Sequence, residues 1–407
     1  MRRHRSAVGT GRRRVVIASR LFTPEVAAAS SRLNCLARGL VNAGCEVEVL
    51  TTRPPAAAGE AEDPKGVRVR RWPALRDEND NIRGYAEYLS FDVPLVLRLL
   101  FTRAPDLIIC EPPPTTGLAV LAVSRLRGLP YAYYAADISS VAAASVGAPF
   151  WVLWLLRLTE SRVLRGACHV LAVSNGVAER LTGFGVLDER VQVVGNGVDT
   201  EIFGQDAVVD ERGPQPPQVP YAVYAGTMSE WQGADVFVRG FACVLDQLPE
   251  GSRLAFLGHG SALPELRHLA EQLVPGRVDF VGVLPPRQAA RWQRSARCAL
   301  VSILPGRGYD FARPTKIYAA TAGGTPVLFA GIGAGAATVR EARLGEAVDH
   351  DPVAVGEALL RALANPPSQA VRTRLAEWTE KNASLARVGQ TAADGVLTAV
   401  GVTEPAG

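Results

Sequence analysis

Short apolar runs with strand character alternate with helical patterns along most of the chain, and this alternation is the strongest constraint on its fold. In the first half, apolar runs at 15–19, 46–51, 107–110 and 131–135 are separated by helical patterns, the first of which covers 30–43. Such alternation is typical of parallel βαβ units, in which each helix returns the chain to the start of the next strand. We therefore expect a Rossmann-like first domain.

The same cycle begins again in the second half of the chain. Strand-like runs occur at 221–226, 253–258, 278–282, 298–304 and 326–331, with helical patterns over 234–248, 263–273, 287–295 and 314–321. Between the two series, residues 206–219 are rich in proline, glycine and charge and have no periodicity, which indicates a linker. The pattern predicts an α/β protein whose two parallel sheets face a central cleft that holds the active site.

These patterns divide the chain into five segments. We expect a disordered basic arm over 1–14, an N-terminal Rossmann-like domain over 15–205, the linker over 206–219 and a C-terminal ligand-binding Rossmann-like domain over 220–370. The last segment, 371–407, is expected to be helical and could cross back to the first domain.

Composition excludes several classes of protein. At 407 residues with 48% hydrophobic and 21% charged residues, the chain can bury two cores, and its apolar runs are too short to span a bilayer. The net charge of +4 owes much to the N-terminal arginines, so no nucleic-acid partner is expected and membrane contact is at most peripheral. The basic N-terminus has no apolar run of signal-peptide length, and the six cysteines form no CxxC pair. We expect a cytoplasmic protein with reduced cysteines that bind no metal.

Two glycine-containing turns in the second half follow predicted strands. Gly226 and Thr227 stand between a strand and a helix, where backbone N–H groups and the helix dipole suit a diphosphate, although an ordinary βα turn is an equal alternative. Gly258 to Gly260 form a second such turn. Within it, His259 is interpreted equally as a turn residue or a ligand contact.

The segment FARPTKIYAATAGGTPV gives the strongest local signal. Pro314 suits the first turn of a helix, which would place Arg313 and Lys316 at the positive end of that helix. A pyrophosphate would be held there by charge and by backbone amides. Lysine occurs only at 65, 316 and 381, so binding is favoured over a solvated basic pair.

The run GIGAGA imitates a dinucleotide-binding fingerprint through Gly331, Gly333 and Ala336, with Asp349 or Asp351 further on. A true fingerprint opens its domain, whereas this run comes near the end of one. We therefore disfavour NAD binding and expect the run to face a sugar or an acceptor.

In the first half, Glu111 and Asp137 each follow a predicted strand, so both are expected at a carboxyl edge that faces the cleft. Asp137 is the better candidate for a polar role near an acceptor, against the alternative that it caps the next segment. His169 is interpreted as a core histidine. Trp151 and Trp154 are interpreted as core residues, with an interfacial membrane contact as the lesser alternative.

Nine segments, taken in order, match the motifs of one known family: SRLFTPEVAAASSRLNCLARGL, CEPPPTTGLAV, AADISS, LAVSNGVAERL, VVGNGVDTEIF, YAGTMSEWQGADV, FLGHG, VDFVGVLPP and RPTKIYAATAGGTPV. The fifth is close to an NGVD-x-x-x-F hallmark at Asn196, Gly197, Val198, Asp199 and Phe203. Together the segments resemble the retaining GT-B glycosyltransferases of family 4, in the branch of bacterial polysaccharide and natural-product enzymes. The resemblance covers nearly the whole chain after the basic arm.

The resemblance implies a GT-B fold and a nucleotide-diphosphate sugar, UDP- or GDP-linked, as a substrate, with no cofactor and no metal. The acceptor is a small molecule or lipid-linked, and its nucleophile (O, N or S) stays open. The expected donor-binding residues are Gly226, Thr227, Met228, Gln232, His259, Gly260, Val283, Arg313, Thr315 and Lys316. On the acceptor side the expected residues are Ala29, Ser30, Arg32 and, as the catalytic residue, Asp137.

Two departures from the family pattern affect the donor site. The family's Arg and Lys after the first strand of the second domain are here Thr227 and Gln232. Its paired glutamates fall on Phe311 and Ala319, and loss of such a charged hydrogen bond to the donor ribose would cost about 1.5–3 kcal/mol unless Asp310 or another group replaces it.

Three functions remain in view. The first is glycosyl transfer with retention, in which positioning and charge stabilise the departing diphosphate. An epimerase of GT-B fold would need carboxylates and a histidine around the sugar ring, and the histidines are few. A non-catalytic homologue is suggested by the missing glutamates.

Overall fold

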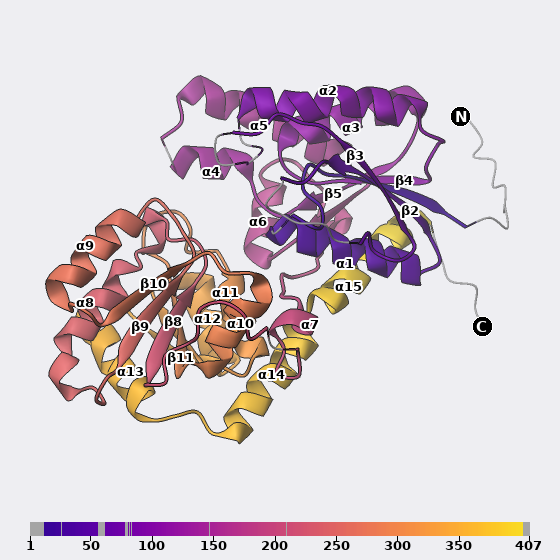
Figure 1. Cartoon of the computed structure of the whole chain (residues 1–407). Helices are drawn as coiled ribbons and strands as arrows, with labels where there is room; N and C mark the ends of the chain where they lie inside the picture. Colours follow the sequence, from indigo (N-terminus) through magenta and orange to yellow (C-terminus); the bar gives the residue numbers. More distant parts are fainter. Residues whose placement is uncertain are drawn as a thin grey trace. The chain divides into compact units, whose positions relative to one another are not determined.

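The computed structural model describes residues 12–25, 27–55, 62–77, 80, 82, 84–145, 147–208 and 210–401. Contacts divide the chain into two compact units (Figure 1). The first contains the chain up to Gly195 together with the residues from Val388 onward, and the second contains Asn196–Arg387. Each unit has its own parallel sheet.

The first unit is built on a seven-stranded parallel sheet in the order β3-β2-β1-β4-β5-β6-β7. Its strands are β1 (Arg14–Ala18), β2 (Glu46–Thr52), β3 (Val67–Trp72), β4 (Leu107–Cys110), β5 (Tyr131–Ala135), β6 (His169–Ala172) and β7 (Val191–Val193). Its helices are α1 (Ala28–Asn42), α2 (Tyr85–Phe101), α3 (Pro114–Arg127), α4 (Ser139–Ser145), α5 (Phe150–Gly166) and α6 (Asn175–Thr182). In Figure 1, α2, α3 and α5 cover one face of the sheet and α1 covers the other.

The second unit is built on a six-stranded parallel sheet in the order β10-β9-β8-β11-β12-β13. Its strands are β8 (Tyr221–Ala225), β9 (Arg253–Leu257), β10 (Val278–Gly282), β11 (Cys298–Ser302), β12 (Val327–Ala330) and β13 (Gly345–Val348). Its helices are α7 (Thr200–Phe203), α8 (Asp235–Cys243), α9 (Leu263–Leu273), α10 (Pro286–Ser295), α11 (Thr315–Ala322), α12 (Gly333–Glu341), α13 (Pro352–Ala364) and α14 (Gln369–Ala383), and α15 (Leu385–Ala399) continues into the first unit.

The central strands read as apolar runs because helices cover both of their faces. In β1, β4 and β5 every residue is buried, and so is every residue of β11 and β12. A parallel sheet covered on both faces selects continuous hydrophobic runs rather than alternation. The predicted α/β fold with two parallel Rossmann-like sheets is confirmed.

Two features of the expected segmentation differ in the structure. Most of the basic arm lies outside the described residues, but Arg14 belongs to β1, where its guanidinium pairs with the buried Glu48. The segment 206–219, expected as a linker, lies inside the second unit because side chains of α10 hold it. Trp292 Nε1 donates to the Pro214 carbonyl at 3.1 Å, and Gln288 donates to Asp210 at 3.3 Å.

Three other expectations concern single side chains. His169 is half-buried on β6 and meets Gln192 at 3.0 Å. Trp151 and Trp154 are not core residues, since they are 67% and 57% exposed on α5. The first half of α5 is apolar nearly all round, so its sequence alone does not tell which side is covered. In the described part of the chain, no helix is long and apolar enough to cross a membrane.

Within the first unit, α15 lies close against α1 through glycine. A Cβ added at Gly389 would stand 2.4 Å from the Cys35 carbonyl group, and one added at Gly39 would stand 2.8 Å from the Gly389 oxygen. Both distances are shorter than real Cβ contacts. The helix backbones therefore approach as closely as they do only because both positions lack a side chain.

We predict that Gly389→Val destabilises the protein by about 1–3 kcal/mol or more, because the added side chain must push α15 away from α1. Denaturant unfolding followed by circular dichroism measures the change. Ala399→Val, at an exposed position near the end of the same helix, is the control and should cost less than about 1 kcal/mol. Equal effects of the two substitutions would contradict the close approach.

Candidate functional site

In each sheet the strand order reverses at one point, between β1 and β4 in the first unit and between β8 and β11 in the second. Ligands of open α/β sheets bind beyond the carboxyl ends of the strands at such points. Most of the residues predicted from the sequence follow these strands. We describe the two units separately, beginning with the second.

Lys316 is the central cation of the second unit's candidate site. It lies in the first turn of α11, two residues after Pro314. Its ammonium donates to the Tyr224 hydroxyl and, at 2.9 Å, to the Thr227 carbonyl, and it lies 3.9 Å from the centroid of the Tyr224 ring. In the described part of the chain no carboxylate forms an ion pair with it, and burial lowers the pKa of Lys316 to about 7.

Tyr224 and Gln232 hold Lys316 in place. Tyr224 is the last residue but one of β8 and is fully buried, and burial raises the pKa of its phenol. Its hydroxyl lies 2.9 Å from the Thr227 carbonyl and 3.0 Å from Gln232 Oε1, which also accepts from the Ser229 N–H. Gln232 is thus a buried cap of the loop after β8. Its amide supports Tyr224, which in turn supports Lys316.

The loops after β8 and β9 are bonded to one another rather than open as an amide cradle. The N–H of Gly226 donates to the Leu257 carbonyl at 2.8 Å, and that of Met228 donates to the His259 carbonyl at 2.9 Å. These two amides are therefore unavailable for a diphosphate, contrary to the sequence-based expectation. The Met228 side chain is fully buried in the core, so Met228 presents neither its side chain nor its N–H to a ligand.

Glycine is required in these two loops because their backbones touch. A Cβ at Gly258 would stand 2.1 Å from the Gly226 oxygen, and one at Gly260 would stand 2.1 Å from the Met228 oxygen. At Gly226, where φ is +134°, a Cβ would stand 2.6 Å from Lys316 Cε. The glycines leave room for Lys316 and keep the exposed edge at Gly226 and Thr227 accessible.

The remaining predicted donor contacts make no hydrogen bond to Lys316 in the described part of the chain. Arg313 and His259 are exposed, and Thr315 opens α11. Val283 is 69% exposed directly after β10. All four follow carboxyl ends of strands in this sheet.

An aromatic stack that sequence reasoning missed lies in the loops after β8 and β11. The rings of Trp231 and Tyr309 are stacked at 4.3 Å between centroids, and Phe311 continues the stack at 6.4 Å from Tyr309. Phe311 therefore contacts an aromatic neighbour at the position of the family's first glutamate, and Ala319, at the second, packs against the core. Neither can bind a ribose hydroxyl through a carboxylate.

Asp310, which lies between Tyr309 and Phe311, is the carboxylate closest in sequence to the first missing glutamate. Its Oδ1 is buried and has no hydrogen-bond partner in the described part of the chain. A buried carboxylate oxygen without a donor is costly, and such groups commonly mark ligand positions.

The glycine run 331–336 packs closely against the loop that contains Asp310. A Cβ at Gly333 would stand 2.0 Å from the Asp310 carbonyl oxygen, which accepts from the Ala334 N–H at 2.8 Å, and one at Gly331 would meet the Ile303 oxygen. Asp351 caps α13 by accepting from two backbone amides. Neither the run nor Asp351 has the role that a dinucleotide fingerprint would give it.

In the first unit, a cavity of about 120 Å³ lies beyond the carboxyl ends of β1, β4 and β5. It is lined by Ser19, Arg20, Leu21, Ala29, Arg32, Glu111, Pro112, Ala136 and Asp137. The predicted residues Ala29, Arg32 and Asp137 are thus brought together. Ser30 is not among the lining residues; it is buried, and its hydroxyl has no hydrogen-bond partner in the described part of the chain.

A buried ion pair forms the wall of this cavity. Arg32 on α1 donates to Glu111 Oε2 at 2.7 Å, and Ser19 donates to Glu111 Oε1 at 2.8 Å. Arg32 also lies over the ring of Tyr134, at 5.1 Å from its centroid. Sequence reasoning ranked Glu111 below Asp137 and missed this pair, whose members are far apart in the chain.

Asp137 is exposed at the cavity, and its Oδ1 accepts from the Ile138 N–H at 2.7 Å. The next turn is tied to α5, because the Ser140 N–H lies 3.3 Å from both oxygens of the buried Glu160. Burial raises the pKa of Glu160. Asp137 therefore holds the N–H of the adjoining residue, outside α4, and keeps an open position at the cavity.

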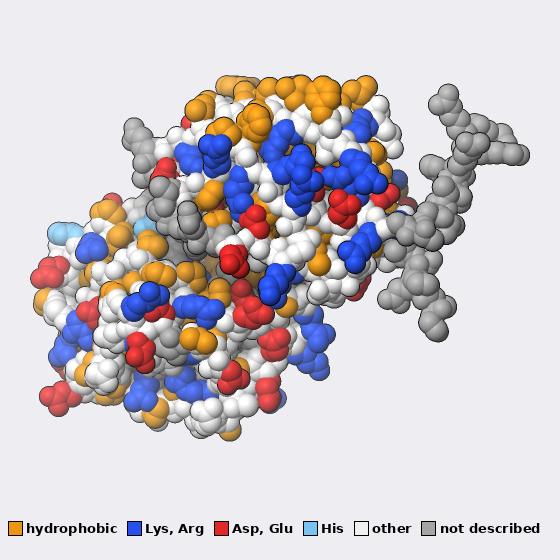
Figure 2. Space-filling model, turned by 45° about the vertical axis from the view of Figure 1, so that its right-hand side comes forward, with side chains coloured by type: hydrophobic (Ala, Val, Ile, Leu, Met, Phe, Trp, Pro, Cys, Tyr) orange, Lys and Arg blue, Asp and Glu red, His pale blue; other side chains and the backbone are white. Residues whose placement is uncertain are grey.

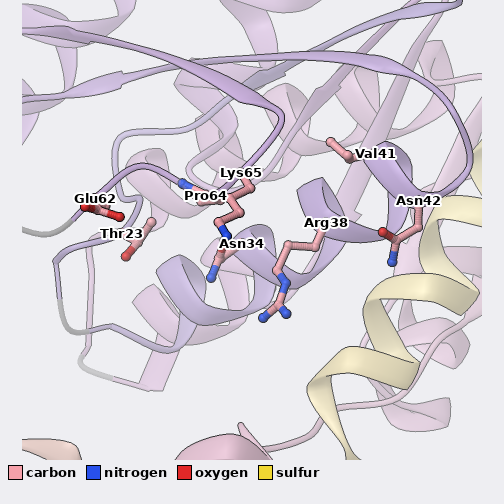
Figure 3. Close-up of a pocket in the computed structure, with 8 residues that line it drawn as sticks. All are labelled: Thr23, Asn34, Arg38, Val41, Asn42, Glu62, Pro64 and Lys65. Atoms are coloured by element: carbon pink, nitrogen blue, oxygen red, sulfur yellow. The ribbon is translucent and has the colours of Figure 1, made fainter.

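A larger pocket of about 400 Å³ lies elsewhere in this unit (Figure 3). Asn34, Arg38, Val41 and Asn42 from α1 line one side, and the segment before β3, with Lys65, lines the other. None of the residues predicted for the site belongs to it.

Comparison with known proteins agrees with the motifs. Residues 28–197 match the glycosyl transferase 4-like domain family. A D-inositol 3-phosphate glycosyltransferase from Streptomyces scabiei is 32% identical over 218 residues, which cover 49% of this chain and 47% of that protein. The chain thus spans about half the length of the curated relatives it matches first. One from Pseudarthrobacter chlorophenolicus is 25% identical over 83% of this chain and 81% of its own length.

Solved structures share the fold at low identity. Sucrose-phosphate synthase from Thermosynechococcus elongatus aligns with a TM-score of 0.71 and 16% identity over 95% of this chain and 98% of its own. Anabaena HepE in complex with UDP-glucose aligns with a TM-score of 0.65 and 14% identity over 95% and 99%. The two parallel-sheet domains have the GT-B fold. The match over residues 28–197 supports the resemblance to glycosyltransferase family 4.

We predict that breaking the buried pair in the first unit is strongly destabilising. Arg32→Met leaves the Glu111 carboxylate buried without its cation and should cost about 3–5 kcal/mol, whereas Arg32→Met with Glu111→Met should recover most of that loss. A double-mutant cycle by denaturant unfolding measures both effects. Additive losses from the two substitutions would contradict the pairing.

We predict that a diphosphate group binds this site with proton uptake near pH 7. The folded, unliganded protein has Lys316 with a pKa near 7, below its ordinary value, so above pH 7 this amine is largely neutral. An anion favours the ammonium and raises that pKa. Affinity should therefore fall as pH rises above 7, by up to about tenfold per pH unit.

Calorimetry of UDP-glucose binding in buffers of different ionisation enthalpy measures this proton uptake, because the diphosphate of the sugar nucleotide does not itself titrate near neutrality. Lys316→Met should abolish the uptake, while Lys381→Met should leave it unchanged. Binding without proton uptake in the unsubstituted protein would show that Lys316 does not meet the diphosphate.

Proposed function

We propose that this chain is a glycosyltransferase that moves a sugar from a nucleotide-diphosphate sugar to a small-molecule or lipid-linked acceptor, with retention of anomeric configuration. The observation that carries the proposal is Lys316, a half-buried ammonium held by neutral oxygens beside the exposed edge at Gly226 and Thr227. A cation in this state lacks an anion. A diphosphate would supply one at the place where α/β sheets bind such groups.

UDP-linked donors are the first choice. The HepE structures, which share this fold, contain UDP or UDP-glucose. The relatives that share up to about half of their length with this chain are described as D-inositol 3-phosphate glycosyltransferases. These descriptions support a nucleotide sugar as substrate. A GDP-linked sugar remains the alternative donor.

The chemical contribution of the second unit would be stabilisation of the leaving group. Lys316 would neutralise charge that develops on the diphosphate, with Arg313 adding to the positive field from the entry of α11. In this scheme side chains and a helix terminus supply the positive charge, and the reaction needs no metal ion. The buried oxygen of Asp310 would accept a hydrogen bond from a hydroxyl group of the nucleotide sugar. It would thus take over the role of one of the two glutamates that this chain lacks.

The first unit would bind the acceptor. Asp137, open at the cavity, would orient or deprotonate the acceptor nucleophile, and the Arg32–Glu111 pair would fix the wall beside it. Whether the nucleophile is O, N or S is left to experiment. The second candidate function, a nucleotide-sugar-binding homologue without activity, is favoured by Phe311 and Ala319 at the glutamate positions.

Nucleotide binding and turnover separate the two candidates. We expect calorimetry with UDP, GDP, ADP and dTDP to show selective binding of one nucleotide, lost in Lys316→Ala and kept in Lys381→Ala. Donor hydrolysis and transfer to a panel of sugar and inositol phosphates, measured with and without EDTA, then test catalysis and metal independence. Binding without turnover on any acceptor favours the non-catalytic homologue, and absence of binding overturns both functions.

For Asp310→Asn we predict that the affinity for the sugar nucleotide falls about tenfold or more, because a charged hydrogen bond contributes about 1.5–3 kcal/mol. The affinity for inorganic pyrophosphate should be unchanged, since Lys316 is intact. Asp349→Asn, at an exposed position in the loop after β13, is the control. An unchanged affinity for the sugar nucleotide would remove Asp310 from the donor site.

A further inference from the structure

The helical layer of the first unit presents an unusual number of exposed apolar side chains. The residues concerned are Leu89, Val93, Leu97 and Phe101 on α2, Leu118 and Leu126 on α3, and Phe150, Trp151, Trp154 and Leu155 on α5. We call this set the apolar face. Figure 2 shows hydrophobic side chains gathered in a band along the top of this unit, over the helical layer, with arginines and lysines directly beneath.

The apolar face is continuous because the three helices pack side by side. Helix α3 contacts both α2 and α5. On α2 the exposed residues recur every fourth position from Leu89 to Phe101, which places them on one stripe of the helix. The opposite side of α2 already fills the core through Phe91, Leu95 and Leu99. The exposed stripe is therefore an addition to the apolar residues that the fold needs.

Exposure at the tips of this face is high. Phe101 is 86% exposed, Phe150 is 83% exposed and Trp151 is 67% exposed. Single exposed apolar residues are ordinary, but a continuous face of large aliphatic and aromatic side chains marks an interaction surface. Its composition, with two tryptophans and two phenylalanines among leucines, is typical of surfaces that enter the boundary between lipid headgroups and acyl chains.

The charge around the apolar face is positive. The three helices carry arginine at 98, 125, 127, 157, 162 and 165, and their only acids are Glu87, Asp92 and Glu160. Asp92 and Glu160 are buried, and burial raises the pKa of each. Glu87 is thus the only accessible acid of these helices.

Two of the arginines are fixed at the margin of the face. Arg98 donates to the Arg70 carbonyl at 2.8 Å, and its guanidinium lies 5.7 Å from the ring centroid of Trp72, which is itself 46% exposed. Arg127 donates to the Leu99 carbonyl. Both therefore hold positive charge beside the end of α2, next to Phe101.

We propose that the apolar face docks on an anionic lipid bilayer, with its aromatic and leucine side chains in the interface and its arginines against lipid phosphates. Charge complementarity favours this occupant over a second copy of the chain. A symmetric dimer through the same face would bring like arginine rims together with Glu87 as the only accessible acid of the three helices to offset them. The proposal does not rest on the donor site in the second unit.

Co-sedimentation of the full chain with vesicles tests the proposal. We expect binding to vesicles of phosphatidylcholine mixed with phosphatidylglycerol, weaker binding to phosphatidylcholine alone, and loss of the difference at high salt. Tryptophan fluorescence should shift to shorter wavelength on binding and should be quenched by brominated lipids.

Variants locate the contact. Trp151→Ser with Trp154→Ser, and independently Leu97→Ser with Phe101→Ser, should each weaken partitioning on the order of tenfold or more. Arg125→Gln with Arg157→Gln should weaken binding to anionic vesicles by roughly fivefold per arginine. The matched control is Leu273→Ser with Val353→Ser, which removes exposed apolar side chains from the second unit and should change nothing.

Unfolding curves and nucleotide binding of each variant establish that it is folded. The proposal is overturned if the unsubstituted protein binds neither kind of vesicle, or if the control pair weakens binding as much as the two pairs on the apolar face. It is also overturned if analytical ultracentrifugation shows a dimer that dissociates when Trp151 and Trp154 are both replaced by serine, and if adding vesicles does not dissociate the dimer of the unsubstituted protein.

Discussion

The hydrogen bonds of Lys316 to the Tyr224 hydroxyl and the Thr227 carbonyl are the interaction on which the candidate donor site depends. They join the first turn of α11 to the end of β8 across the point where the strand order reverses. Gln232 accepts a hydrogen bond from the Tyr224 hydroxyl, and the absence of a side chain at Gly226 leaves room for the aliphatic part of Lys316. Because every partner is neutral, the charge of the protonated lysine is not balanced within the site, and a bound anion would be stabilised there.

The candidate site of the first unit also contains a cation, but that cation has a carboxylate partner. There the cation, Arg32, is already neutralised by Glu111, and Ser19 fixes the second carboxylate oxygen. The ion pair is therefore a rigid wall and leaves the neighbouring Asp137 as the open carboxylate of the cavity.

The sequence was sufficient to predict the parallel sheets, because the strands are buried on both faces and appear as continuous apolar runs. It also singled out Lys316, because lysine is rare in this chain and because this lysine stands just after a proline suited to the first turn of a helix. Contacts between distant segments escaped it. Whether Met228 faces a ligand depends on bonds to the loop after β9, and the segment 206–219 is held by α10, so neither could be inferred locally.

Side chains with ordinary core character were the other source of error. Tyr224 stands in an apolar strand and gives no sign of its hydroxyl's role, and Trp151 and Trp154 stand in a helix that is apolar on most sides. Only the packed structure shows which sides are covered. The same packing separates the fully buried Tyr224 from the exposed tryptophans of the apolar face.

The central claim, that Lys316 is an uncompensated cation that meets a diphosphate, is tested most directly by nuclear magnetic resonance of protein carrying isotope-labelled lysine. The chain contains only three lysines, so each signal can be assigned by substitution. The account predicts that the Lys316 signal titrates near pH 7 without ligand and at higher pH with UDP-glucose. The signals of the other two lysines should not respond to the nucleotide sugar. Three signals with ordinary titration that do not respond to the nucleotide sugar would contradict it.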